Sequence, residues 1–258
     1  MISGLLLDLS GVLYIDDKPL EGAIKSLLRL QQTGLPVRYV TNTTRSPRIK
    51  IHQQLTQLGF NIHLDELYTA PMAAHAYLNT HQLSPFMLIH PDLENEFADI
   101  KQGAHNAVLI GDAEQRFTYN HMNMAFRLLI QGYPLIAMGK NRYFMQQDGL
   151  SIDAGAFVTA LEYAANTRAI ITGKPDAEFF HAAVKDMDIS LETTVMIGDD
   201  VEADVNGAID AGLKAILVKT GKYRTGDENS INAELSLCVQ DFNHAIDWVI
   251  ENIETGSD

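Results

Sequence analysis

The sequence is poor in cysteine, basic residues and long apolar runs. Cys238 is the only cysteine among 258 residues, so no disulfide can form within the chain. Lys and Arg number 19 against 33 Asp and Glu, which gives a formal net charge of −14, and without a basic run we expect no binding to nucleic acid or to an anionic membrane. No apolar stretch approaches the roughly 20 residues that span a bilayer, and the first residues lack the basic flank of a signal peptide. These absences predict a cytoplasmic protein.

What the sequence does contain is the composition of a globular protein. Hydrophobic residues make up 46% and charged residues 20%, which is unlike the apolar-poor composition of disordered chains. At about 150 residues per domain, the length predicts one large α/β unit or a core with a sizeable insertion.

Short apolar runs alternate with helical patterns in the first and last parts of the chain. The run at 4–9 is apolar up to Asp8 and stops at Ser10-Gly11, as expected of a strand that is buried on both faces. Strands are expected at 4–9, 36–40, 169–172, 193–197 and 215–218, and helices at 21–32, 48–58, 176–186, 203–211 and 241–253. This alternation predicts an α/β fold with a Rossmann-like, doubly wound parallel sheet.

A second α/β pattern lies between these two parts. Strands are expected there at 85–90, 106–110 and 134–138, and helices at 119–131 and 153–165. We therefore predict a core domain of residues 1–75 and 169–258, with a smaller α/β cap domain inserted at 76–168.

Polar residues follow the strands that are expected in the core. They are Asp8, Thr41 with Asn42, Lys174, and the acidic group Asp199, Asp200 and Asp204. Since the carboxyl ends of parallel strands share one edge of a sheet, we expect these side chains to converge. Carboxylates suit Mg²⁺, a lysine and a threonine hydroxyl can hold phosphoryl oxygens, and a carboxylate can attack phosphorus.

Four ordered motifs resemble those of the haloacid dehalogenase superfamily. They are Asp8-Leu9-Ser10-Gly11-Val12-Leu13-Tyr14, Thr41-Asn42, Gly173-Lys174-Pro175 and Gly198-Asp199-Asp200 with Asp204. The insertion between the second and third motifs is similar to the large cap of subfamily IIA, the branch with the nucleotide and sugar-phosphate phosphatases. The resemblance implies a Mg²⁺-dependent phosphatase for a small phosphorylated substrate, and a homodimer formed through the cap.

The resemblance also implies a role for each motif residue. Asp8 would be the nucleophile that forms an aspartyl phosphate, while Thr41 and Lys174 would bind phosphoryl oxygen. Mg²⁺ would be held by the Asp8 carboxylate, the Ser10 main-chain carbonyl and Asp199, with Asp200 and Asp204 orienting the metal's surroundings. The candidate substrate-binding residues are Ser10, Thr41, Asn42, Lys140, Arg142 and Lys174.

Ser10 departs from the pattern of most phosphatases of this family, which have an aspartate two residues after the nucleophile. A serine hydroxyl cannot act as a general acid near neutral pH, and such assistance is worth about 10²–10⁴-fold. We therefore expect slow turnover of alkyl phosphate esters. Pyrophosphate, the N-phosphorylated amines of lysine and histidine that the resemblance also implies, and aryl phosphates should suffer less because their leaving groups need less protonation.

Other interpretations of the same residues stay open from the sequence. Thr41 and Asn42 could be turn or capping residues, Lys174 a solvated loop lysine, and the Asp199–Asp204 acids could complement a helix dipole. A broad sugar-phosphate or nucleotide phosphatase is the nearest alternative enzyme. A weakly active, phosphate-binding signalling protein is the alternative from another class, because Ser10 replaces the usual acid.

Overall fold

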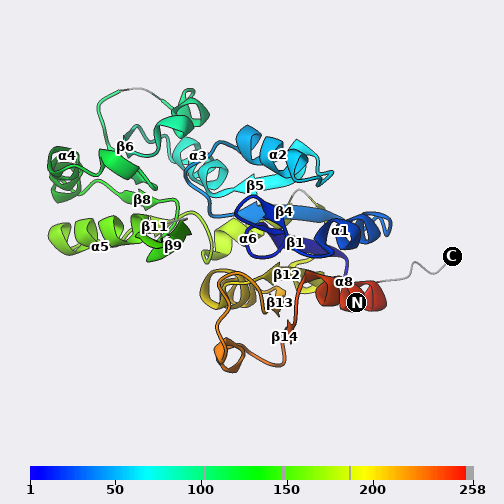
Figure 1. Cartoon of the computed structure of the whole chain (residues 1–258). Coiled ribbons are helices and arrows are strands. Elements are labelled where there is room, and N and C mark those ends of the chain that lie inside the picture. Colours follow the sequence, from blue (N-terminus) through cyan, green and yellow to red (C-terminus); the bar gives the residue numbers. More distant parts are fainter. Residues whose placement is uncertain (102, 147–148, 186, 254–258) are drawn as a thin grey trace. The chain divides into compact units, whose positions relative to one another are not determined.

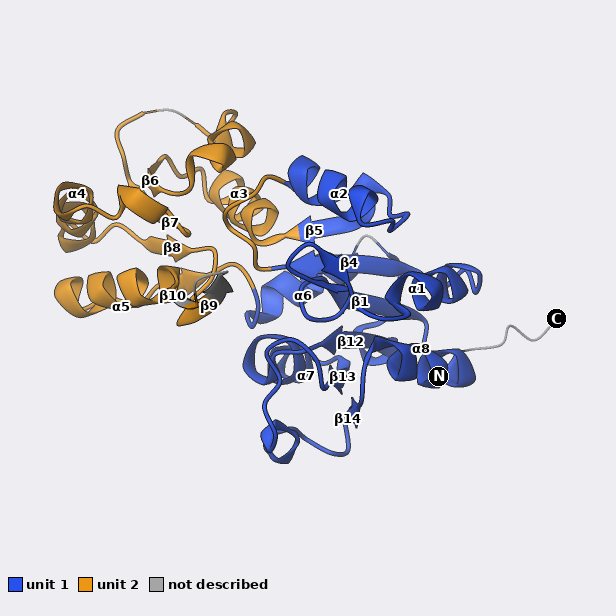
Figure 2. Ribbon diagram, in the orientation of Figure 1, with its two compact units in different colours: residues 1–41, 48–68, 174–258 blue, residues 42–47, 69–173 orange. Residues whose placement is uncertain are grey.

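The computed structural model of the chain describes residues 1–101, 103–146, 149–185 and 187–253. The chain divides into two compact units (Figure 2). Unit 1 comprises residues 1–41, 48–68 and 174–258, and unit 2 comprises residues 42–47 and 69–173. Each unit has its own sheet, and the two are described in turn.

Unit 1 is built on a six-stranded sheet whose order is β14-β13-β12-β1-β4-β5. These strands are β1 (Gly4–Asp8), β4 (Val37–Thr41), β5 (Leu67–Thr69), β12 (Thr194–Gly198), β13 (Lys214–Val218) and β14 (Ser236–Val239). From β14 to β4 every neighbouring pair is parallel. β1 lies inside the sheet and all five of its residues are buried, which confirms the parallel α/β core that the alternation predicts.

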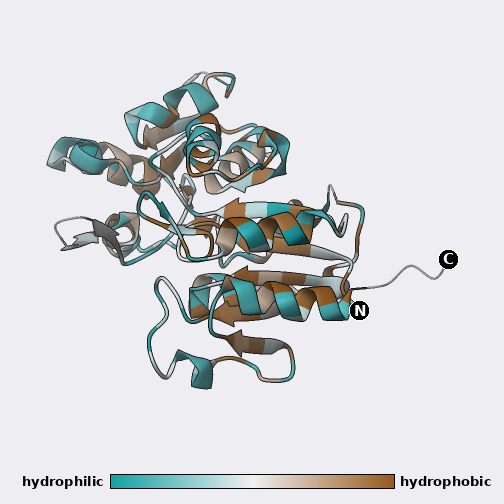
Figure 3. Cartoon of the chain, turned by 45° about the vertical axis from the view of Figure 1, so that its right-hand side comes forward, coloured by the Kyte–Doolittle hydropathy of each residue, from teal (hydrophilic) through white to brown (hydrophobic). Residues whose placement is uncertain are grey.

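Helices cover both faces of this sheet (Figure 1). They are α1 (Ala23–Gln31), α2 (Arg48–Gln57), α6 (Ala177–Lys185), α7 (Gly207–Asp210) and α8 (Phe242–Asn252). α1, α2 and α8 bury apolar side chains in one cluster with Leu5 and Leu7 of β1. Successive residues of a strand point to opposite faces of the sheet. α6 contacts β4 and α7 contacts β13, but neither helix has residues in this cluster. These two helices therefore cover the other face. The strands and the inward sides of the helices are accordingly apolar (Figure 3).

Unit 2 has a four-stranded parallel sheet in the order β11-β8-β7-β6. Its strands are β6 (Pro85–Leu88), β7 (Ala107–Ile110), β8 (Leu135–Ala137) and β11 (Ile170–Ile171), and its helices are α3 (Ala70–Thr80), α4 (Tyr119–Ile130) and α5 (Ala154–Ala165). Unit 2 begins before residue 76 because Ala70, Ala74 and Leu78 of α3 are buried in its apolar cluster. The cap bounds of 76–168 stay a prediction.

One predicted strand belongs to a different sheet. The run at 169–172 was expected in the core, but β11 pairs with β8 through Ile170 opposite Ile136 and Ile171 opposite Ala137. Ala169 and Ile171 pack against the apolar cluster of unit 2, so burial there decides the pairing. The expectation that Lys174 follows a core strand is therefore wrong, although Lys174 itself belongs to unit 1.

Several short elements complete the described chain. They are the antiparallel strand pairs β2 (Tyr14–Ile15) with β3 (Lys18–Pro19) and β9 (Tyr143–Gln146) with β10 (Gly149–Ile152), the 3₁₀ turns η1 (Leu64–Glu66), η2 (Pro91–Phe97), η3 (Glu114–Arg116), η4 (Leu191–Thr193) and η6 (Asp227–Ser230), and the π-helical turn η5 (Val201–Asn206). The helix expected at 203–211 is thus η5 followed by α7, and the end of the helix expected at 176–186 lies outside the described residues. Among the described residues, no helix has the length and apolar character needed to cross a membrane.

Candidate active site

The core sheet places three of the predicted residues at one of its edges. Asp8 ends β1, Thr41 ends the neighbouring β4, and Asp199 directly follows β12 on the other side of β1. The strands are parallel and in register, with Leu7 opposite Ile197 and Asp8 opposite Val40. The three polar residues therefore leave the sheet at the same end, and all three are buried.

Lys174 joins two of the acids in a buried ion triad. Its ammonium nitrogen donates to Asp8 Oδ1 at 2.6 Å and to Asp204 Oδ1 at 2.5 Å. The lysine is only 3% exposed, which excludes a solvated loop lysine. Lys174 follows the short β11 and precedes Pro175 across a cis peptide bond, so the chain brings it to Asp8 from outside the core sheet.

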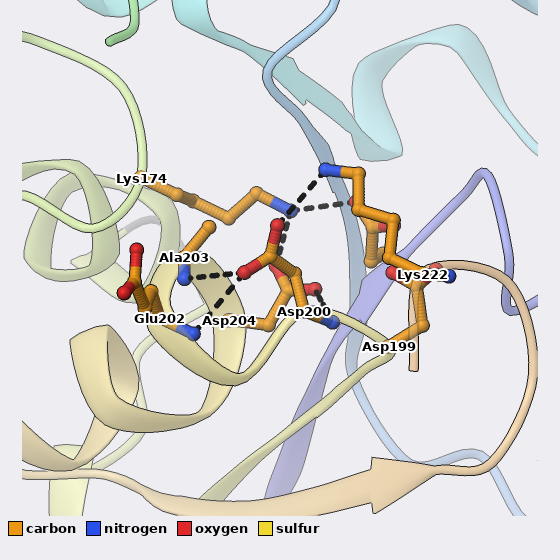
Figure 4. A network of polar contacts seen from close by, with 8 residues as sticks. Lys174, Asp199, Asp200, Glu202, Ala203, Asp204 and Lys222 are labelled. Carbon is orange, nitrogen blue, oxygen red and sulfur yellow. Dashed lines mark hydrogen bonds and ion pairs between the residues drawn. The ribbon is translucent and has the colours of Figure 1, made fainter. Parts of the chain in front are cut away.

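Asp200 and Asp204 lie on the turn that follows β12 (Figure 4). The Asp200 carboxylate caps η5 by accepting hydrogen bonds from the backbone N–H groups of Glu202 at 3.1 Å and Ala203 at 3.0 Å. Asp204 Oδ2 accepts from the Asp200 N–H at 3.2 Å, and Gly198 leaves room for it, because a Cβ there would be 2.3 Å from the Asp204 Cβ. The helix-capping interpretation thus applies to Asp200, whereas Asp204 faces Lys174.

The carboxylates at this site repel one another. Burial raises the pKa of Asp199 well above the ordinary carboxyl value, and the charges of Asp8 and Asp204 raise it further. Burial also raises the pKa of Asp204, to about 6, against the lowering effect of Lys174. For Lys174, burial opposes the charged form, but the Asp204 and Asp8 carboxylates raise its pKa above the usual lysine value. The site therefore holds more negative charge than one lysine neutralises.

A divalent cation fits this donor set. Asp8, Asp199 and Asp204 are buried, and each offers a carboxylate oxygen within 4.8 Å of the others. Both oxygens of Asp204 already accept hydrogen bonds. In the part of the chain that the structure describes, Asp8 Oδ2 and Asp199 Oδ1 accept none. Hard carboxylate oxygens are the ligands that Mg²⁺ prefers, so Asp8 and Asp199 are the two side chains best placed to bind it.

Adding Mg²⁺ to protein freed of metal with EDTA should raise its melting temperature. A cation that binds the folded chain and not the unfolded one stabilises it by about 2.7 kcal/mol at a free concentration of 100 times its dissociation constant. The measurement is thermal unfolding by circular dichroism with and without Mg²⁺ at constant ionic strength. An equal rise in the Asp199→Asn variant would contradict this assignment of the site.

The other predicted site residues lie in different surroundings. Ser10 is exposed, one residue after the buried Leu9. Asn42 belongs to unit 2. Its side chain lies against the backbone of Gly173, because a Cβ on Gly173 would be 2.7 Å from Asn42 Oδ1. Lys140 and Arg142 are exposed in unit 2, and the Lys140 ammonium is paired with Glu162 at 2.6 Å. The structure thus brings together Asp8, Thr41, Lys174, Asp199, Asp200 and Asp204.

Sequence reasoning assigned no role to Lys222. Its backbone N–H donates to Asp199 Oδ2 at 2.6 Å, and its ammonium binds Asp200 Oδ2 at 2.9 Å (Figure 4). Two signals in the sequence included Lys222: the segment Thr220-Gly221-Lys222-Tyr223-Arg224 contributes to the family resemblance, and Gly221-Lys222 is the third Gly-Lys pair along the chain. Every residue except proline has a backbone N–H, so the residue types could not show that the Lys222 N–H donates to Asp199.

Two family models match this chain. The model described as "Haloacid dehalogenase-like hydrolase" matches residues 5–101, and the one described as HAD-hydrolase-like matches residues 171–245. The chain is 43% identical over 252 residues to haloacid dehalogenase-like hydrolase domain-containing protein 2 of Bos taurus, covering 98% of this chain and 97% of that protein. It is 36% identical over 259 residues to the human phospholysine phosphohistidine inorganic pyrophosphate phosphatase, covering 98% and 96%.

The fold is also similar to solved structures. One is glycerol phosphate phosphatase from Mycobacterium tuberculosis in complex with magnesium, with a TM-score of 0.83 at 22% identity, covering 93% of this chain and 76% of that one. The chain belongs to the haloacid dehalogenase-like hydrolase family. One of its relatives, at 36% identity, is named a phosphatase, and the solved structure shares the fold.

Proposed function

We propose that the chain is a Mg²⁺-dependent phosphatase that works through a phosphorylated Asp8. The observation that carries the proposal is the buried triad in which Lys174 lies 2.6 Å from Asp8 and 2.5 Å from Asp204, with the Asp199 carboxylate beside it. A nucleophilic carboxylate, a cation to hold phosphoryl oxygen and a second carboxylate for Mg²⁺ are the groups that such a reaction needs.

In the first step, an Asp8 oxygen forms a bond to phosphorus while the bond from phosphorus to the leaving group breaks. Lys174 keeps the Asp8 carboxylate oriented and is positively charged, as the rise of its pKa indicates. Thr41, which is buried at the end of the neighbouring strand, supplies a hydroxyl for a phosphoryl oxygen. Mg²⁺, held by Asp8, Asp199 and the Ser10 carbonyl, would neutralise charge on the transferred group.

In the second step, water attacks the phosphorus of phospho-Asp8. The bond between phosphorus and the aspartyl oxygen breaks, inorganic phosphate leaves and the Asp8 carboxylate is restored. Asp204 keeps Lys174 in place through their ion pair. Because Ser10 is no general base near neutral pH, this step is slow and phospho-Asp8 accumulates.

The proposed substrates are small phosphorylated compounds with good leaving groups. Pyrophosphate releases phosphate as a stabilised anion, and a protonated N-phosphorylated amine releases the neutral amine, so neither substrate depends fully on a general acid at residue 10. A relative that is 36% identical is named a phospholysine phosphohistidine inorganic pyrophosphate phosphatase, which supports the same class. Asn42, Lys140 and Arg142 of unit 2 stay candidate substrate contacts. The cytoplasmic location and the homodimer stay predictions.

A phosphate-release panel tests this function. Pyrophosphate, an N-phosphorylated amine, an aryl phosphate and an alkyl sugar phosphate are compared with Mg²⁺ and with EDTA. We expect release only with Mg²⁺, and turnover at least about 10²-fold slower for the alkyl ester than for the other three, since general acid assistance is worth about 10²–10⁴-fold. A preference for the sugar phosphate would instead favour a broad sugar-phosphate phosphatase, and no release at all would favour a signalling protein.

A further inference from the structure

The Asp199 carboxylate is enclosed by backbone on two sides. A Cβ on Gly11 would be 2.0 Å from Asp199 Oδ2, and a Cβ on Gly221 would be 1.9 Å from the same oxygen. Both distances are shorter than any non-bonded contact between a carbon and an oxygen atom. Neither glycine can therefore be replaced by a residue with a side chain unless Asp199 moves. Gly221 comes from the loop after β13 and Gly11 from the loop after β1.

Hydrogen bonds fasten the two loops around this carboxylate. The Lys222 N–H donates to Asp199 Oδ2 at 2.6 Å, and the Thr220 hydroxyl donates to the Gly11 carbonyl. A Cβ on Gly221 would also be 2.6 Å from the Gly11 Cα, which shows how closely the two backbones approach. The Lys222 ammonium then extends to Asp200 Oδ2 at 2.9 Å (Figure 4).

These contacts engage one oxygen of Asp199 and leave the other available. Oδ2 accepts from Lys222, whereas no hydrogen bond of the described residues reaches Oδ1. A metal ligand whose second oxygen is fixed by a hydrogen bond keeps its orientation and needs no reordering when the ion binds. The arrangement is that of a carboxylate oriented in advance.

We infer that Thr220, Gly221 and Lys222 are positioning residues for the cation site. Together they hold the Asp199 carboxylate so that Oδ1 is available to the ion. The Lys222 N–H donates a hydrogen bond to Oδ2, Gly221 permits the close approach of the loop, and the hydrogen bond from Thr220 to the Gly11 carbonyl joins the two loops. This inference rests on the proposed function only in taking Asp199 as a Mg²⁺ ligand. It predicts that changes in this loop act on metal affinity rather than on the chemical step.

The decisive variant is Gly221→Ala, with Gly34→Ala as its matched control. Both glycines have a left-handed backbone, with φ of +58° and +72°, but a Cβ on Gly34 meets nothing within 4 Å. The alanine in Gly221→Ala must displace Asp199 Oδ2. Binding of Mn²⁺, a substitute for Mg²⁺ at carboxylate sites, is measured without substrate by electron paramagnetic resonance. Because loss of a partner that orients a ligand costs about 10–100-fold in affinity, the dissociation constant should rise by that factor for Gly221→Ala and stay unchanged for Gly34→Ala.

Activity gives a second readout. In Gly221→Ala, the Mg²⁺ concentration for half-maximal phosphate release should rise by the same factor, and kcat should recover at saturating Mg²⁺. If Gly221→Ala does not fold, Thr220→Val decides, since it removes only the hydroxyl that binds Gly11; an unchanged dissociation constant there overturns the inference.

The two hypotheses fail in different ways. Wild-type protein that binds no Mn²⁺ and releases phosphate equally well in EDTA contradicts the proposed function. Wild-type protein that binds Mn²⁺ tightly, with Gly221→Ala binding it as tightly as Gly34→Ala, overturns only the role of the loop.

Discussion

Asp8→Asn should abolish phosphate release, with a loss of at least about 10⁴-fold in kcat, because single substitutions of a catalytic nucleophile have effects of that size or larger. Asparagine has the shape of aspartate but cannot form the acyl phosphate. It still offers an oxygen to Lys174, whose ammonium also binds Asp204. The variant should therefore unfold cooperatively like the wild type, which separates lost chemistry from lost structure.

The measurements are phosphate release with Mg²⁺ and acid-stable ³²P labelling after rapid quench. Wild type should show a Mg²⁺-dependent label, since Ser10 leaves the second step slow, and Asp8→Asn should show none. Asp16→Asn is the matched control, because Asp16 is exposed and its φ of +52° suits asparagine; its activity should equal that of the wild type. Comparable rates for Asp8→Asn and wild type would exclude Asp8 as the nucleophile.

The position of Lys174 shows both the reach and the limit of sequence reasoning. Lys174 was expected beside Asp8 because it was thought to follow a strand of the core sheet; the contact is present, but that reason for it is wrong. The apolar run before Lys174 correctly predicts a strand. The sheet to which this strand belongs was predicted wrongly. An apolar run such as Ile170-Ile171 fits any parallel sheet, and its sequence does not identify the strand with which it pairs. Pairing with β8 is set by the cluster buried in unit 2, which is a property of the folded chain.

The acidic group after β12 illustrates a second limit. Asp199, Asp200 and Asp204 stand within six residues and have the same side chain, yet their surroundings differ: Asp199 accepts from a loop N–H, Asp200 caps a turn and Asp204 binds Lys174. Sequence spacing indicates that acids gather here. It cannot say which oxygen accepts which hydrogen bond, because Asp199 Oδ2 and Asp200 Oδ1 accept from backbone N–H groups, which every residue except proline has.

Ser10→Asp should speed hydrolysis of an alkyl phosphate ester by about 10²-fold or more in kcat/KM, as general acid assistance is worth about 10²–10⁴-fold. Ser10 is exposed, so a longer side chain meets no packed core. The new carboxyl would stand two residues from Asp8, and the negative charges of Asp8 and Asp199 favour its protonated form. Such a group can protonate an alkoxide as it leaves and then take a proton from the attacking water.

The control for this variant is Ser10→Asn, which has nearly the same size and no acidic proton. The two variants are compared on an alkyl ester and on pyrophosphate, whose leaving group needs little protonation. The gain should be confined to Ser10→Asp and be larger for the ester, and the acid-stable label should fall because the second step also becomes faster. If both variants hydrolyse the ester equally, the serine does not limit the reaction, and the absence of an acid at residue 10 cannot explain a preference for good leaving groups.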